Sequence, residues 1–208
     1  MELILVGGGG HCLSCIDVIE AGQEHAIVGI VERDGIDTTT LYGYPVLGTD
    51  AQLPGLLERG DAVVVTVGQI ADPEPRRALF KLLNSLSAHL ITICAPDSTV
   101  SKRAKVGSGS AILSKATVNA GASVGENCII NSHALIEHGA RIGDHSHIST
   151  GALVNGAVSI GEACFIGSGA VIREGVVIGA ESVIGAGALI GESIPPGSRV
   201  RANWSHRL

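Results

Sequence analysis

The chain has 208 residues and a formal net charge of −6, and 45% of its residues are hydrophobic while only 2% are aromatic. The negative charge argues against a nucleic-acid partner, and no apolar run approaches the roughly 20 residues of a membrane span. The core must be built from aliphatic side chains, and the length suits one large or two small domains.

The N-terminus enters a strand-like run at residues 2–6 without a basic region, so we expect no signal peptide and predict a cytoplasmic protein. An odd number of cysteines, five, argues against a disulfide framework. Cys12 and Cys15 form a C-x-x-C motif, but no second pair completes a zinc site. We interpret both as small buried residues of a helix and predict no metal.

Residues 1–95 are predicted to form an α/β domain that resembles half of a Rossmann fold. Strands that alternate with helices indicate a parallel sheet. Pro96 marks the end of this domain. The expected strands are 3–6, 26–31, 46–48, 62–67 and 89–93, and the expected helices are 13–20 and 76–86.

A glycine-rich turn between the first strand and the first helix is a candidate phosphate site. Glycine lets backbone N–H groups approach an anion closely, and the helix N-terminus adds partial positive charge. The G-x-G-x-x-G spacing is not met, because Cys12 or Leu13 replaces the third glycine, which favours a mononucleotide or nucleotide sugar over NAD. A tight turn without a ligand is the structural alternative. The substrate-binding candidates are Gly7, Gly8, Gly9, Gly10, Glu32 and Asp34, the last two for ribose or base, together with Gly68.

Residues 98–194 follow a strict six-residue period, which indicates a solenoid. Each period suits one short strand and one turn, with an inward aliphatic residue and often a glycine that allows the corner. Three periods close a triangular coil of 18 residues, so we predict a parallel β-helix that ends at Pro195-Pro196, followed by a tail at 195–208. The inward positions are Val100, Val106, Ile112, Val118, Val124, Ile130, Ile136, Ile142, Ile148, Val154, Ile160, Ile166, Ile172, Ile178, Ile184 and Ile190.

Four histidines, His133, His138, His145 and His147, lie within 15 positions of this solenoid. Isoleucine occupies the inward positions, so these imidazoles should point outward or lie at corners. Acyl transfer needs a base that works near neutral pH. His138 is the favoured base, because its neighbours one coil away are Ala120 and Gly156, which leave a groove for a thioester. Glu137 and Asp144 are the carboxylates that could orient it.

The runs V-G-G-G-G-H (6–11) and I-E-H-G-A-R-I-G-D-H-S-H (136–147), with the hexapeptides, resemble the sialic acid O-acetyltransferase type of nucleotide-sugar acetyltransferase, which includes bacillosamine and perosamine N-acetyltransferases. The resemblance implies left-handed β-helices in a homotrimer, with a nucleotide-sugar site in the N-terminal domain and acetyl-CoA along the solenoid as co-substrate. It also assigns roles. By match, His138 with Glu137 is catalytic; His11 and Asn131 contact the substrate; His147, Gly156, Ser168 and Ala186 bind acetyl-CoA.

The chain departs from the family pattern at two places. Gly139 follows the base where the family has an acidic residue, which favours an amine acceptor because a hydroxyl demands a stronger base. The usual Gly-x-Pro-Ala element of the tail is replaced by 202–205, where Trp204 either caps the last coil or stacks on adenine.

The predicted reaction is direct acetyl transfer to the amino group of a nucleotide-linked 4-amino sugar. O-acetylation of a sialic acid or another sugar is the nearest alternative. A non-catalytic scaffold or nucleotide-sugar sensor is a second one, and a zinc enzyme of the carbonic anhydrase kind, with only a pair of histidines at suitable spacing, is a third. The sequence leaves open UDP or GDP, the sugar and the glycan that it enters.

Overall fold

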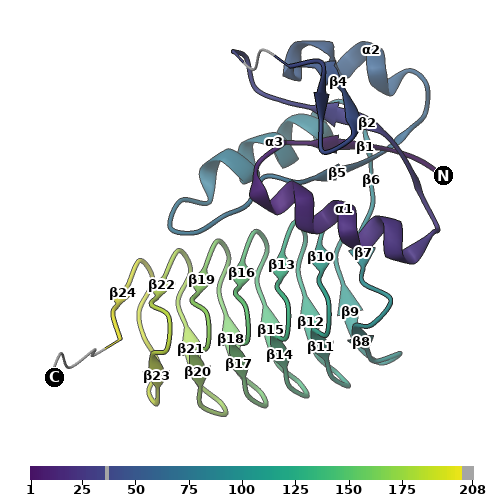
Figure 1. Cartoon of the computed structure of the whole chain (residues 1–208). Coiled ribbons are helices and arrows are strands. Elements are labelled where there is room, and N and C mark those ends of the chain that lie inside the picture. The colour runs from purple at the N-terminus through teal and green to yellow at the C-terminus, as the bar shows by residue number, and fades with distance from the viewer. Residues whose placement is uncertain (36–37, 203–208) are drawn as a thin grey trace, which may run out of the picture.

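The computed structural model describes residues 1–35 and 38–202. It consists of an N-terminal module of helices and a sheet (residues 1–92), seated on one side of a triangular solenoid (residues 93–202) (Figure 1). Trp204 and its two expected alternatives lie outside the described residues. Within these residues, no helix is long and apolar enough to cross a membrane.

The N-terminal module contains a six-stranded sheet in the order β3-β4-β2-β1-β5-β6. All neighbouring strands are parallel except β3 and β4, which form a small hairpin. Parallel strands buried on both faces consist of continuous apolar runs, as at 3–6 and 62–65. The strands are β1 (Glu2–Val6), β2 (Ala26–Val31), β3 (Thr40–Leu41), β4 (Tyr44–Gly48), β5 (Ala62–Val65) and β6 (His89–Leu90).

Two long helices connect this sheet to the solenoid. Helix α1 (Gly10–Gly22) buries Cys12, Cys15 and Ile16 in a cluster that also contains Ile93 and Ala111 of the solenoid. Helix α3 (Glu74–Ser85) buries Phe80 and Leu83 in a second cluster, against the other side of the sheet. Strand β4 contains the strand predicted at 46–48, whereas its hairpin partner β3 and the short helices η1 (Asp50–Gln52) and α2 (Leu53–Leu57) were not predicted from the sequence.

The solenoid has three parallel sheets, one for each face of the prism. We name them the docked face, which the N-terminal module covers, the apolar face and the polar face, after the side chains that point outward. The docked face contains β7 (Ile93–Cys94), β10 (Ala111–Ile112), β13 (Ile129–Ile130), β16 (His147–Ile148), β19 (Phe165–Ile166), β22 (Val183–Ile184) and β24 (Arg199–Val200). The apolar face contains β8 (Thr99–Val100), β11 (Thr117–Val118), β14 (Leu135–Ile136), β17 (Leu153–Val154), β20 (Val171–Ile172) and β23 (Leu189–Ile190). The polar face contains β9 (Lys105–Val106), β12 (Ser123–Val124), β15 (Arg141–Ile142), β18 (Ser159–Ile160) and β21 (Val177–Ile178).

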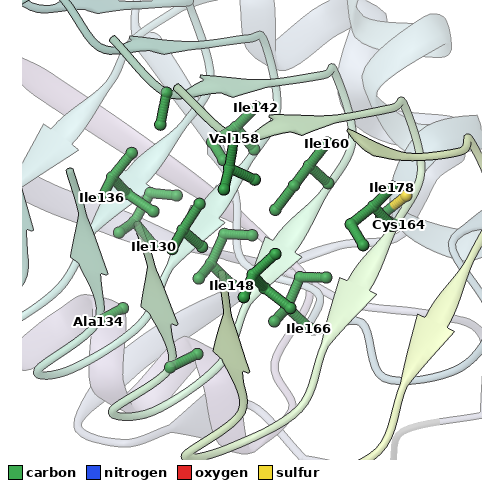
Figure 2. Close-up of a cluster of buried hydrophobic side chains, with 14 of the residues drawn as sticks. Ile130, Ala134, Ile136, Ile142, Ile148, Val158, Ile160, Cys164, Ile166 and Ile178 are labelled. Carbon is green, nitrogen blue, oxygen red and sulfur yellow. The ribbon is translucent and has the colours of Figure 1, made fainter. Parts of the chain in front are cut away.

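The predicted 18-residue coil is observed in the strand register. Ile130 pairs with Ile148 and Ile136 with Val154, each 18 positions apart. Within each two-residue strand the first side chain points outward and the second inward. Figure 2 shows the inward isoleucines, together with small residues such as Ala134 and Cys164, filling the interior. Among the described residues no bulky aromatic ring enters this interior, so aliphatic stacking supplies the core seen there.

The ladder begins earlier and ends later than the expected 98–194. The strand predicted at 89–93 is divided: β6 belongs to the sheet of the N-terminal module, whereas β7 already pairs with β10. Beyond Pro195-Pro196, β24 pairs with β22 and adds a further rung. Proline cannot donate to a ladder, but here it lies in the corner between rungs.

The glycines after the inward positions serve a different purpose from the expected one. They do not adopt the left-handed corner conformation; residues two positions later, such as Asn127 and His145, do. A Cβ placed on Gly143 would lie 2.5 Å from the backbone nitrogen of Glu162 in the next coil. Glycine is therefore required for the close stacking of successive coils at Gly107, Gly125, Gly143, Gly161, Gly167 and Gly179, where a Cβ would come within 3.0 Å of the next coil, but not at Gly191, where it would meet nothing within 4 Å.

Candidate active site

A cleft of about 960 Å³ lies between the N-terminal module and the docked face. The glycine turn, the ends of β2 and β5 and the start of α3 form its walls, and Asn131 and His147 of the solenoid close it on the other side. Crevices at the carboxyl ends of parallel strands are the usual ligand sites of such sheets. The structure thus brings the predicted nucleotide site and two predicted solenoid residues into one cavity.

The glycine turn is suited to an anion at its helix end. Side chains added at Gly9 and Gly10 would meet nothing within 4 Å, so the backbone there faces open space. No side chain caps the N-terminus of α1, which is 13 residues long. Its first N–H groups are available to a phosphate, and the helix dipole favours negative charge there.

At the other end of the turn, Gly8 donates its N–H to the carboxylate of Glu32, and the Tyr42 hydroxyl donates to the Gly8 carbonyl at 3.1 Å. Glu32 lines the cleft, whereas Asp34 is exposed outside its lining. Asp50, which sequence reasoning missed, lines the cleft beside Glu32. Burial, together with the charges of Asp34 and Glu32, raises the pKa of Asp50. This acidic end supplies acceptors for the hydroxyl and N–H donors of a nucleoside.

His147 lies in the cleft wall of its own chain with only 7% of its surface exposed. Its Nδ1 contacts the Gln69 carbonyl oxygen, and its Nε2 lies 3.1 Å from the Asn131 amide nitrogen. Because a carbonyl can only accept, Nδ1 carries the proton and Nε2 accepts. Burial lowers the pKa of His147 to about 4, so the ring is neutral at pH 7.

His11 lies at the start of α1, next to Gly68. A Cβ added to Gly68 would lie 3.2 Å from the Cβ of His11. Its Nε2 is 3.5 Å from the Cys15 sulfur. Burial, aided by the positive charge of Arg76, lowers the pKa of His11 to about 3. Both imidazoles of the cleft are therefore neutral hydrogen-bonding groups, and neither provides positive charge to a phosphate.

His138 lies elsewhere, at the corner between the apolar and polar faces (residues 137–140). It is exposed and does not line the cleft. The expected stacking is observed: a Cβ on Gly156 would lie 2.8 Å from Cε1 and Nε2 of the imidazole. Glu137 accepts a hydrogen bond from the backbone N–H of His138 at 3.0 Å, so it fixes the main chain there. Asp144 accepts from the backbone N–H of Glu126 at 2.8 Å in the preceding coil.

Three of the four predicted acetyl-CoA residues occupy two corners, whereas the fourth, His147, lies in the cleft wall. Gly156 lies beneath His138, whereas Ser168 and Ala186 are exposed one coil apart at the corner between the docked and apolar faces. Ser168 shares a 2.9 Å hydrogen bond with Ser149. The corner of Ser168 and Ala186 is also that of Asn131, which lines the cleft. Within one chain, the apolar face separates this corner from His138 and Gly156.

The C-x-x-C motif belongs to the core. Burial raises the pKa of Cys12 to about 11 and that of Cys15 to about 12, so both remain protonated thiols. In the part of the chain that the structure describes, no group of three His, Cys, Asp or Glu side chains is arranged to hold a metal ion.

Sequence reasoning also missed the wall opposite the glycine turn. The position of this wall at the carboxyl end of β5 was the available signal, because loops at this edge form ligand sites. An apolar surface there follows the loop after β5 and the first turns of α3. Its residues are Ile70, Pro75, Ala78, Leu79 and Leu82, with Gln69 beside them.

Family models match both parts of the chain: the PglD N-terminal domain at residues 2–83, and the bacterial transferase hexapeptide (six repeats) at 121–156 and 157–192. A histidine variant of perosamine N-acetyltransferase from Caulobacter crescentus, solved with CoA and GDP-perosamine, is 30% identical. It gives a TM-score of 0.90, with 97% of this chain and 93% of that chain covered. The chain belongs to this family of hexapeptide-repeat acetyltransferases. It is an acyltransferase by membership, which confirms the predicted resemblance and the predicted fold class of a half-Rossmann domain followed by a left-handed β-helix.

Two further structures resemble this acetyltransferase over its whole length. The acetyltransferase domain of PglB from Neisseria gonorrhoeae FA1090, solved with acetyl coenzyme A, is 32% identical with a TM-score of 0.88, covering 97% of this chain and 96% of that chain. WeeI from Acinetobacter baumannii AYE, at 23% identity and a TM-score of 0.86 over 100% of both chains, shares the fold. No curated protein matches the chain.

Proposed function

We propose that this enzyme transfers an acetyl group from acetyl-CoA to the amino group of a nucleotide-linked 4-amino sugar, with His138 as general base. The observation that carries the proposal is the single cleft that joins an uncapped helix N-terminus to Asn131 and His147. Such a cleft suits a ligand with a phosphate in its middle and a sugar at the solenoid. The CoA and GDP-perosamine complex of the Caulobacter enzyme supports this assignment.

In the proposed binding mode, the nucleoside lies at the acidic end near Glu32 and Asp50, and the diphosphate lies over Gly9 and Gly10. The sugar reaches Asn131 and His147. The neutral His147, whose two ring nitrogens are occupied, orients the Asn131 amide, which keeps a second N–H for the sugar. The apolar wall along α3 would cover a weakly polar face of the sugar or base.

The distance between His138 and the cleft within one chain supports a site shared by neighbouring subunits of a homotrimer. The apolar face lies between the two groups and presents Leu135, Leu153, Val171 and Leu189 outward. Leu153 is 37% exposed and Leu189 76%, which is unfavourable for surfaces left in water. A second copy packed there would cover these side chains and bring its His138 to the cleft of the first, with acetyl-CoA between the two corners.

In the proposed reaction the sugar nitrogen attacks the thioester carbonyl carbon. The N–C bond forms while His138 accepts the proton from nitrogen; the C–S bond then breaks, and the proton is delivered to the CoA sulfur. Catalysis rests on proton transfer and on the alignment of two substrates. The engagement of Glu137 with the main chain favours an amine acceptor, which needs less help from the base than a hydroxyl.

The test is thiol release from acetyl-CoA with UDP- and GDP-linked 4-amino sugars, and with free sialic acid as the hydroxyl acceptor. We expect one amino sugar to be turned over and kcat to fall by about 10²-fold or more in His138→Ala, the scale of a lost general base. His89→Ala, at an exposed histidine on the edge strand β6 outside the cleft lining, is the matched control and should retain activity. Turnover of sialic acid alone would instead support O-acetylation. Nucleotide-sugar binding without acetyl-CoA binding would support a sensor.

A further inference from the structure

We propose that Arg76 is a positioning residue of this site, which ties the wall of the cleft after β5 to the solenoid and so fixes the spacing between the nucleotide end and the sugar end. The inference rests on the proposed function, because it concerns the alignment of that substrate. We refer to residues 66–73, between β5 and α3, as the wall loop.

The guanidinium of Arg76 joins three segments that are distant in sequence. Its Nη1 donates to the carbonyl oxygens of Val65 at 2.7 Å and Val67 at 2.9 Å, at the end of β5 and in the wall loop. Its Nε donates to Asn127 O and its Nη2 to Gly109 O, each at 3.2 Å. The last two carbonyls belong to successive coils at the corner between the polar and docked faces.

Arg76 is unusual because the side chain is wholly buried, and no carboxylate pairs with it among the described residues. Burial lowers its pKa to about 10, so it remains a cation at neutral pH. A buried charge is costly unless its donors are satisfied, and an apolar side chain would fill the same space without that cost. Arginine suits this position because its planar guanidinium holds several N–H donors at fixed angles. It can therefore bind carbonyl groups of the N-terminal module and of the solenoid at the same time.

The wall loop touches both ends of the cleft. Thr66 donates its hydroxyl to the Gly7 carbonyl at 2.5 Å, and Val67 packs so closely on Gly7 that a Cβ there would collide with it. Gln69, two residues further, accepts from His147 on the solenoid. Displacement of the loop would therefore move the glycine turn and the partner of His147 together.

The helix that bears Arg76 has other attachments, so loss of the fork should not detach it. Phe80 packs edge-on against His145, with ring centroids 5.5 Å apart. Arg77 forms ion pairs with Glu74 at 3.4 Å and Glu181 at 3.9 Å. Arg77 is thus a matched control: it is a neighbouring arginine that also bridges α3 and the solenoid, but among the described residues its guanidinium forms no ion pair with the wall loop. Only its backbone N–H, which any replacement keeps, donates to the Pro73 carbonyl at 3.0 Å.

The experiment compares Arg76→Lys, which keeps the charge without the fork, with Arg76→Met, which removes both, and with Arg77→Met. Without substrate, we expect the amide of Thr66, the wall-loop N–H that donates to the Val6 carbonyl at 2.8 Å, to exchange hydrogen at least about tenfold faster in both Arg76 variants, as local opening becomes easier. With substrates, kcat/KM for the nucleotide sugar should fall by about tenfold or more while KM for acetyl-CoA changes by less than about twofold. Arg77→Met should match the wild type in all three measurements.

A second readout reports whether the Arg76 charge stays beside the cleft in the folded protein, which a variant that is merely less stable would not change. Burial lowers the pKa of His147, and the Arg76 charge lowers it further; the other groups near this charge are His11, Cys15 and Cys128. We expect the His147 titration, followed by NMR, to move upward in Arg76→Met and to remain low in Arg76→Lys.

Unchanged loop exchange in both Arg76 variants, or an equal loss of affinity for both substrates, would overturn the positioning role. If the wild type turns over no nucleotide sugar, the proposed function fails, and the exchange and titration results still decide the role of Arg76.

Discussion

Two histidines only nine positions apart have opposite surroundings, which fit them for different tasks. His147 is buried with both ring nitrogens occupied, so its orientation and tautomer are fixed. His138 is exposed, its ring rests on Gly156, and its side-chain nitrogens are free of protein partners among the described residues. A group that must gain and lose a proton during turnover needs the second environment, whereas a group that holds a ligand-binding neighbour such as Asn131 in place benefits from the first.

Gly156→Ala tests the placement of His138 without touching the imidazole. The new methyl group would lie 2.8 Å from Cε1 and Nε2, so the ring must move away. Gly156 has no positive φ, so alanine is tolerated by the backbone. We expect kcat to fall by about tenfold or more, with a melting temperature within a few degrees of the wild type. Gly191→Ala, where a Cβ meets nothing within 4 Å, is the control. Unchanged kcat in Gly156→Ala would argue against His138 as the base.

Acid should destabilise the folded protein through His147. Its folded-state pKa of about 4 is below the value near 6.5 of an unfolded histidine, so the unfolded chain binds more protons between these values. Stability attributable to His147 is therefore complete above about pH 6.5 and is lost as the pH falls toward 4, by on the order of 3 kcal/mol. Thermal melts from pH 7.5 to 4 should show a smaller decline in His147→Gln than in the wild type. Parallel declines would contradict the burial of a neutral ring.

At the scale of elements, the strands of the solenoid could be predicted almost residue by residue. A fixed period leaves one choice of inward residue per strand, and a stacked coil admits no slip of register. Strand β3 and the helices η1 and α2 escaped prediction because isolated segments of two to five residues carry too little periodicity, whereas β4 was expected in part at 46–48. The division between β6 and β7 was missed because an apolar run cannot indicate which of two sheets it joins.

The candidate site was predictable where a motif contained the chemistry and not where tertiary contacts supplied it. The glycine turn, Glu32, Asn131 and His147 meet in one cleft. Arg76 escaped, because an arginine in the first turn of an amphipathic helix is ordinarily solvated. Only the folded structure shows that carbonyls from two coils and the wall loop converge on its guanidinium.

At the scale of the whole molecule, the three faces of the prism differ in what covers them. The N-terminal module covers the docked face, where Ala111 and Ile129 are fully buried. The polar face presents Lys105 and Arg141 to solvent, with Val177 on its last strand. The apolar face presents threonines on its first two strands, β8 and β11, and leucines and a valine on the four that follow. The cleft opens on one edge of the apolar face and His138 stands at the other. One further copy on this face would complete a site, and a closed ring would complete every site with the same contact.

Mixed assemblies test this arrangement. His138→Ala lacks the proposed base but keeps an intact cleft, whereas His147→Gln lacks a cleft residue but keeps the base. If each site joins His138 of one subunit to the cleft of the next, a trimer that contains both variants has one junction where an intact cleft meets an intact base. Mixed trimers, co-expressed and purified through a different tag on each variant, should therefore recover about one third of wild-type activity. Each variant alone should remain inactive. A mixture no more active than its components would mean that both histidines act within the same chain. In that case His11→Gln, a second cleft variant, should also fail to restore activity when it is mixed with His138→Ala.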